Sequence, residues 1–230
     1  MSVHFLRQID RLKRMILSLG ELVQDAVDMG IAAVEKRDPK LADQVFEMEQ
    51  RTDQMEIEVE EECLHTLALH QPVAFDLRYV VSALKINADL ERIADLAVNI
   101  AEQAVYMSRE DRLLELPFDL PHMARLTKGM LRDALKAMVD VDTALAQKVV
   151  ETDDMVDHIH ETAYDRIYKA IRENPQKVEQ LVHLLSVSRQ LERIADHAVN
   201  IAEDVIYTSR GEIMRHRGKP KTPATPTQIS

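Results

Sequence analysis

The feature that most constrains this chain is a stretch of twenty residues that occurs twice. It reads LERIADLAVNIAEQAVYMSR at 90–109 and LERIADHAVNIAEDVIYTSR at 191–210. The two copies lie 101 positions apart and agree at 15 of 20 residues. Self-similarity over so long a period is the signature of an internal duplication, so we expect two similar structural units.

The composition favours helices and excludes several classes of protein. The 230 residues include only 5 Gly and 8 Pro, and 46% are hydrophobic, which is typical of an all-α protein. A formal net charge of −11 argues against broad nucleic-acid binding, which needs a basic face. No signal peptide and no apolar run of roughly 18 residues is present, so we expect a cytoplasmic protein. The single cysteine, Cys63, lies in an amphipathic pattern and is expected to be buried.

Apolar residues recur at alternating spacings of four and three, which is the period of helices packed in a bundle. Helices are expected over about 3–36, 39–70, 74–108, 121–140, 143–173 and 175–209. Ser2, Asp38 and Asp142 are the expected N-caps, and Asn174 should cap the last helix as Asp38 caps the second.

Each predicted helix has one apolar stripe, which must be buried against neighbouring helices. The simplest fold is therefore all-α, with two tandem three-helix bundles related by the duplication. We assign residues 1–112 to the first bundle, 113–119 to a linker and 120–211 to the second bundle. Residues 212–230 are basic and rich in Pro and Thr, and we expect them to be disordered.

Four pairs of acidic residues, each spaced four positions apart, border the predicted core stripes on a helical wheel. Two pairs lie in the repeated stretches and two in the helices that precede them: Glu91/Asp95 and Glu192/Asp196, then Glu49/Asp53 and Asp153/Asp157. If the two helices of each half pack side by side, four carboxylates converge. Converging carboxylates repel one another and suit hard or borderline cations. The pairs therefore predict two metal sites, and a solvated acidic face beside the core is the alternative.

Other candidate residues carry weaker signals. His197 directly follows one of these acids and could assist a metal, although a packing role is the commoner one. Glu62-x-x-His65 has a di-iron spacing but lacks the second motif that such a site needs. Arg92 and Arg193 are turned toward solvent on the wheel and could face a partner. No phosphate loop, nucleophile elbow or zinc spacing is present, so we do not expect an enzyme. A carboxylate-bridged multinuclear metalloenzyme and a metal-free structural scaffold remain open.

The segment HQPVAFDLRYVVSALKINADLERIAD at 70–95, the second LERIADHAVNIAED at 191–204 and the doubled three-helix plan resemble the PhoU family. The resemblance covers about residues 3–210, and the family often has Gly where this chain has Ala94 and Ala195.

The resemblance to PhoU implies a cytoplasmic, non-enzymatic regulator of phosphate homeostasis. It implies an adaptor between the ATP-binding subunit of the phosphate ABC transporter and the sensor histidine kinase of the phosphate response. Such an adaptor meets the membrane only through these partners, and it restrains the starvation response and phosphate uptake when phosphate is plentiful. The resemblance further implies divalent or trivalent metal ions (Fe, Zn, Mn or Mg) at the four acidic pairs, and commonly a homodimer.

Overall fold

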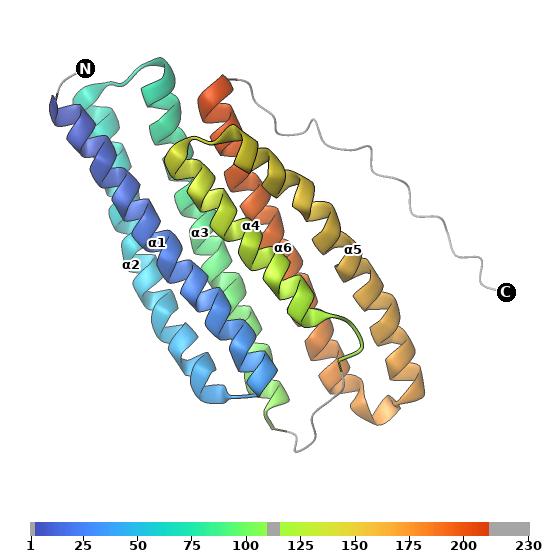
Figure 1. The fold of residues 1–230 in the computed structure, drawn as a ribbon. Helices are drawn as coiled ribbons and strands as arrows, with labels where there is room; N and C mark the ends of the chain where they lie inside the picture. Colours follow the sequence, from blue (N-terminus) through green and yellow to red (C-terminus); the bar gives the residue numbers. More distant parts are fainter. Residues whose placement is uncertain (1–2, 110–115, 212–230) are drawn as a thin grey trace.

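The computed structural model describes residues 3–109 and 116–211, and within these ranges the chain contains helices and no strands. The helices are α1 (Val3–Lys36), α2 (Pro39–His70), α3 (Ala74–Met107), α4 (Leu120–Asp140), α5 (Thr143–Glu173) and α6 (Val178–Arg210), with a short 3-10 helix η1 (Pro175–Lys177) before α6. The helices α1–α3 and α4–α6 form two three-helix bundles that lie side by side (Figure 1). The predicted all-α class and doubled architecture are confirmed.

The predicted starts of α2 and α5 agree with the structure, and their capping residues form the expected bonds. The Asp38 side chain accepts a hydrogen bond from the Lys40 backbone N–H, and the Asp142 side chain accepts two from the first turn of α5. The prediction for Asn174 is wrong, since its side chain makes no capping bond. Its carbonyl oxygen instead accepts from the Lys177 N–H at 3.0 Å. This short-range bond closes a 3-10 turn, so the α-helical part of the last element begins at Val178.

Three predictions fall partly or wholly on residues outside the described ranges. These are the Ser2 cap, the linker at 113–119 and the tail at 212–230. The division of the chain at the linker therefore stays a prediction. Among the helices that the structure does describe, none is long and apolar enough to cross a membrane.

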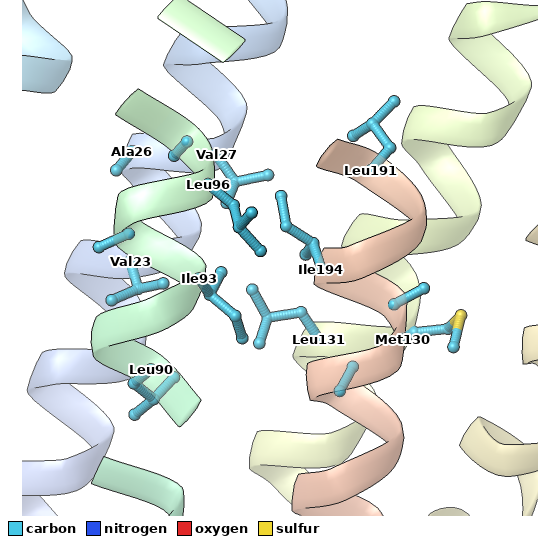
Figure 2. Packing of buried hydrophobic residues seen from close by; sticks show 14 of the residues in the cluster. Val23, Ala26, Val27, Leu90, Ile93, Leu96, Met130, Leu131, Leu191 and Ile194 are labelled. Atoms are coloured by element: carbon cyan, nitrogen blue, oxygen red, sulfur yellow. The ribbon is translucent and has the colours of Figure 1, made fainter. Parts of the chain in front are cut away.

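The two bundles meet along α3 and α6, which run antiparallel and share an extensive interface. Ile93 of α3 and Ile194 of α6 are equivalent under the shift of 101 positions, and both are fully buried. Figure 2 shows Ile93 and Leu96 extending toward Ile194 and toward Leu131 of α4. The centre of the core is thus a place where equivalent residues of the two halves meet, as expected for a pseudo-twofold arrangement.

Polar contacts along α3 and α6 follow the same pseudo-twofold relation. Near one end of this seam, the Ser82 hydroxyl donates to the Asp204 carbonyl oxygen at 3.3 Å. Near the other end, the His183 Nδ1 and the Gln103 Oε1 lie 2.8 Å apart. Residues 82 and 183 are equivalent under the duplication, and so are 103 and 204. These contacts fix the register between the bundles and leave α2 and α5 on the outer flanks (Figure 1).

Candidate functional site

The first acidic face lies where α2 packs against α3. Glu49 of α2 is half-buried, while Asp53 of α2 and Asp95 of α3 are exposed. Burial raises the pKa of Glu49, and the charges of Asp53, Asp95 and Glu102 raise it further. Two of these three charges belong to α3, so carboxylates of the two helices face each other across the helix pair.

Glu91 of α3 repeats this pattern from the opposite helix. Its side chain is half-buried, and burial is the largest cause that raises its pKa. The charge of Asp95 raises the pKa next, and the charges of Glu56 and Asp53 on α2 add to it, whereas Arg92 lowers it. All four predicted acids of the first half thus lie on one face.

The second acidic face lies where α5 packs against α6. Burial raises the pKa of Asp157, and the charges of Asp196 and Glu161 raise it further. Burial also raises the pKa of Glu192, with Asp196 and Asp157 as the next causes. Asp153 is half-buried one turn before Asp157. In the second half, the carboxylates that lie near one another, as predicted, are therefore those of Asp157, Glu192 and Asp196.

Two arginines stand beside these faces and are exposed, as the helical wheel predicted. Arg92 lowers the pKa of Glu91, and Arg193 lowers the pKa of Glu192 and of Asp196. Each guanidinium therefore favours the ionised form of its neighbouring acids. A role of these arginines in partner binding stays a prediction.

Each face also contains a partly buried polar contact that sequence reasoning missed. The Asn87 amide donates to the Glu56 carbonyl oxygen at 2.9 Å and to the Glu56 Oε1 at 3.1 Å. In the other half the His160 Nδ1 lies 2.9 Å from the Ser188 Oγ. Positions 87 and 188 are related by the 101-residue shift, and that relation was the available signal. These contacts hold Glu56 and His160 at the border between acidic face and core.

His197 has a partner outside the acidic face. Its Nδ1 lies 2.8 Å from the Oδ1 of Asp89, which projects from α3 of the other bundle. The Asn200 amide donates to the same oxygen at 3.4 Å. This contact lies at the α3–α6 interface between the two bundles, so the His197 imidazole has a structural role. Asp89 itself lies outside both copies of the repeated stretch, and no pattern in the sequence indicates its partner.

The donor set of the two faces is chemically suited to a hard or borderline cation, because it consists of carboxylates that repel one another. The side chains are not gathered into a finished cage. Within residues 3–109 and 116–211, no three His, Cys, Asp or Glu side chains are grouped closely enough to hold a metal ion. Holding one would therefore require these side chains to rotate toward a common point.

Comparisons with known proteins agree on one family. The PhoU domain matches residues 16–104 and 120–205, once in each half. A phosphate-specific transport system accessory protein PhoU homolog from Pseudomonas putida is 36% identical over 217 residues, which are 94% of this chain and 85% of that protein.

Two crystal structures share the fold over nearly the whole described chain. PhoU from Pseudomonas aeruginosa has a TM-score of 0.87 at 35% identity and covers 90% of this chain and 100% of its own. The phosphate transport system regulatory protein PhoU from Streptococcus pneumoniae has a TM-score of 0.81 at 27% identity, with 91% and 98% covered. These proteins are named as accessory or regulatory proteins and not as enzymes, which agrees with the prediction for this chain.

Proposed function

The chain belongs to the PhoU family, and from that membership we propose that it regulates phosphate homeostasis as a cytoplasmic adaptor. In this proposal it links the ATP-binding subunit of the phosphate ABC transporter to the sensor histidine kinase of the phosphate response. It restrains the starvation response and phosphate uptake when phosphate is plentiful, and it acts as a homodimer. The observation that carries the proposal is the family match in both halves of the chain.

We further propose that the two acidic faces bind divalent or trivalent metal ions, among which Fe, Zn, Mn and Mg suit carboxylate ligands. The raised pKa values of Glu49 and Glu91 in one half, and of Asp157 and Glu192 in the other, support this proposal. Burial and then the neighbouring acids make these carboxylates costly to ionise. A bound cation would offset this cost by favouring the ionised form of these carboxylates.

The regulatory proposal is tested by deletion and complementation. A strain that lacks the protein should express phosphate-starvation genes at high phosphate, and the intact gene should restore repression. Unchanged expression in the deletion strain would refute the proposal. A variant with Arg92→Glu and Arg193→Glu should fail to repress and should no longer co-purify with transporter or kinase. The same charge reversal at the exposed Lys136 of α4 serves as the control.

The metal proposal is tested on purified protein that has never met a chelator. Elemental analysis should find metal in the native protein and less in a variant with Asp53→Asn and Asp95→Asn, in which only the second acidic face is intact. A matched control is Asp43→Asn, which removes an exposed acid of α2. A ligand at one hundred times its Kd stabilises the folded state by about 2.7 kcal/mol, so chelation should lower the Tm of the native protein. Less than about 0.2 metal per chain would instead favour a metal-free scaffold.

A further inference from the structure

A cleft with a volume of about 410 Å³ lies between the two bundles, where α1 faces α4. It is separate from both acidic faces, which lie on the α2–α3 and α5–α6 pairs. Val27 of α1 and Leu131 of α4 form its apolar floor, and both are buried. The volume falls within the range of ordinary small-molecule sites, roughly 300–1,000 Å³.

The α4 wall of this cleft is basic. Arg125, Lys128 and Arg132 line it at spacings of three and four residues, which places them on one side of the helix. The α1 wall contributes Gln24 and a single acid, Asp28. Three cations thus face one anion in a protein whose formal net charge is −11. A local excess of positive charge in so acidic a chain attracts anions to this cleft in particular.

The contacts that these three cationic side chains make within the protein still allow them to bind a ligand. The Lys128 ammonium lies 2.7 Å from the Asp28 carboxylate across the cleft. Arg132 binds Asp133, its neighbour in the sequence, through two nitrogens at 2.9 and 3.1 Å. Among the contacts of the described residues, none engages the guanidinium of the exposed Arg125. The Asp28 carboxylate therefore lies where one anionic group of a ligand could bind, and the Arg125 guanidinium could bind a second anionic group.

Gly129 lines the same cleft from the interior of α4. A glycine inside a helix costs about 1 kcal/mol relative to alanine, so it usually has a packing reason. The described residues offer no such reason, because a Cβ at this position would meet no atom within 4 Å apart from its neighbours and its own helix backbone. The missing side chain instead keeps open a part of the wall between Lys128 and Arg132.

We propose that this cleft binds a small anion that carries phosphoryl groups and at least two negative charges. Arginine recognises phosphoryl oxygens through paired hydrogen bonds, and lysine adds a point charge. Arg125 and Lys128 can each offer one positive charge to such an anion once it replaces the Asp28 carboxylate, and the apolar floor can receive an uncharged part of a larger ligand. The shared chemistry is the phosphoryl group, which inorganic phosphate, pyrophosphate and a nucleotide could each supply.

Isothermal titration calorimetry on the full-length protein tests this proposal. The protein and buffers are stripped with a chelating resin, because soluble EDTA is itself a polyanion and because a metal on the acidic faces could bind phosphate. Phosphate, pyrophosphate and ATP are titrated at matched ionic strength. At least one should bind with a Kd on the order of 0.1 mM or tighter, and the strongest binder identifies the source of the phosphoryl group.

Three variants locate the binding. Replacing Arg125 and Arg132 with Gln should weaken the preferred ligand by about tenfold or more. Asp28→Asn removes the competing carboxylate and should tighten binding, an outcome that misfolding would not produce. Gly129→Leu fills part of the cleft and should weaken the larger ligands most. Lys136→Gln, an exposed cation one turn further along α4, should leave the Kd unchanged.

Two results would overturn the proposal. One is that none of the three compounds binds at concentrations up to several millimolar. This result would overturn the proposal even if an acidic peptide such as oligoglutamate did bind. The other is a Kd that responds to Lys136→Gln as strongly as to the Arg125 and Arg132 substitutions, since this would indicate attraction to general surface charge.

Discussion

Severing the contact between Asp89 and His197 should destabilise the protein by more than either residue's packing accounts for. The two side chains approach within 2.8 Å and are only 12% and 14% exposed. A hydrogen bond that involves a charged group contributes about 1.5–3 kcal/mol, and a buried partner left alone loses more. We expect Asp89→Ala and His197→Ala each to lower the free energy of unfolding by about 2–3 kcal/mol.

A double-mutant cycle separates this contact from packing. If the contact acts as the geometry indicates, the double variant should be more stable than the sum of the single losses predicts, with a coupling energy of about 1.5–3 kcal/mol. Urea unfolding followed by circular dichroism measures all four proteins at pH 7. Metal-free buffer keeps the neighbouring acidic face from contributing to the difference.

The duplication provides a matched control for this cycle. The positions equivalent to Asp89 and His197 are Gln190 and Leu96 in the other half. The Gln190 Oε1 is buried and, among the described residues, has no hydrogen-bond partner. A cycle on Gln190 and Leu96 should therefore give a coupling energy below about 0.5 kcal/mol. Equal coupling energies at the two places, or a value below 0.5 kcal/mol for Asp89 and His197, would refute the reasoning.

Three further predictions follow from burial and charge. Ile93→Ala should cost about 2–5 kcal/mol of unfolding free energy, since it opens a cavity where the two bundles meet, and a loss below 1 kcal/mol would contradict that packing. Glu192→Gln should raise the thermal unfolding midpoint of the metal-free protein at pH 7. A raised pKa of the Glu192 carboxyl means that this group stabilises the folded state at low pH and that the stabilisation is lost as the pH rises. The gain in the midpoint should therefore vanish below about pH 4, and a gain that persists there has another cause. Burial raises the pKa of Cys63 to about 12, so a thiol reagent at pH 8 should label it only after unfolding, and rapid labelling of the folded protein would show an open site.

The fold was predictable because its determinants are local and repeated. The apolar stripes that predicted α1 and α2 are buried or half-buried in the structure, and Asp38 and Asp142 cap helices as their side chains allow. Cys63 is fully buried, as its place in the stripe of α2 predicted. The error at Asn174 arose because Asn and Asp share a capping preference, whereas the choice between a 3-10 and an α-helical first turn depends on tertiary packing.

The contacts between the bundles were not predictable in the same way. A helical wheel places a residue on a side of its own helix and does not say which residue of another helix lies opposite. Asp89 and His197 are 108 positions apart, and their contact depends on the antiparallel register of α3 against α6. The basic cleft was missed for the same reason, because Lys128 and Asp28 meet only when α4 packs beside α1.

The acidic faces show why the wheel could find candidate ligands but could not say whether they need a cation. That question depends on the balance between burial, like charges and nearby arginines. At Glu91 the favourable charge of Arg92 is outweighed, since the pKa remains raised by burial and by Asp95. At Asp196 burial outweighs both His197 and Arg193. At these two acids, the nearby cations of the described residues therefore do not offset the cost of ionisation. A charge supplied from outside, by a metal ion or by a basic partner surface, would stabilise the folded state most at neutral pH, where the ionised acids repel one another.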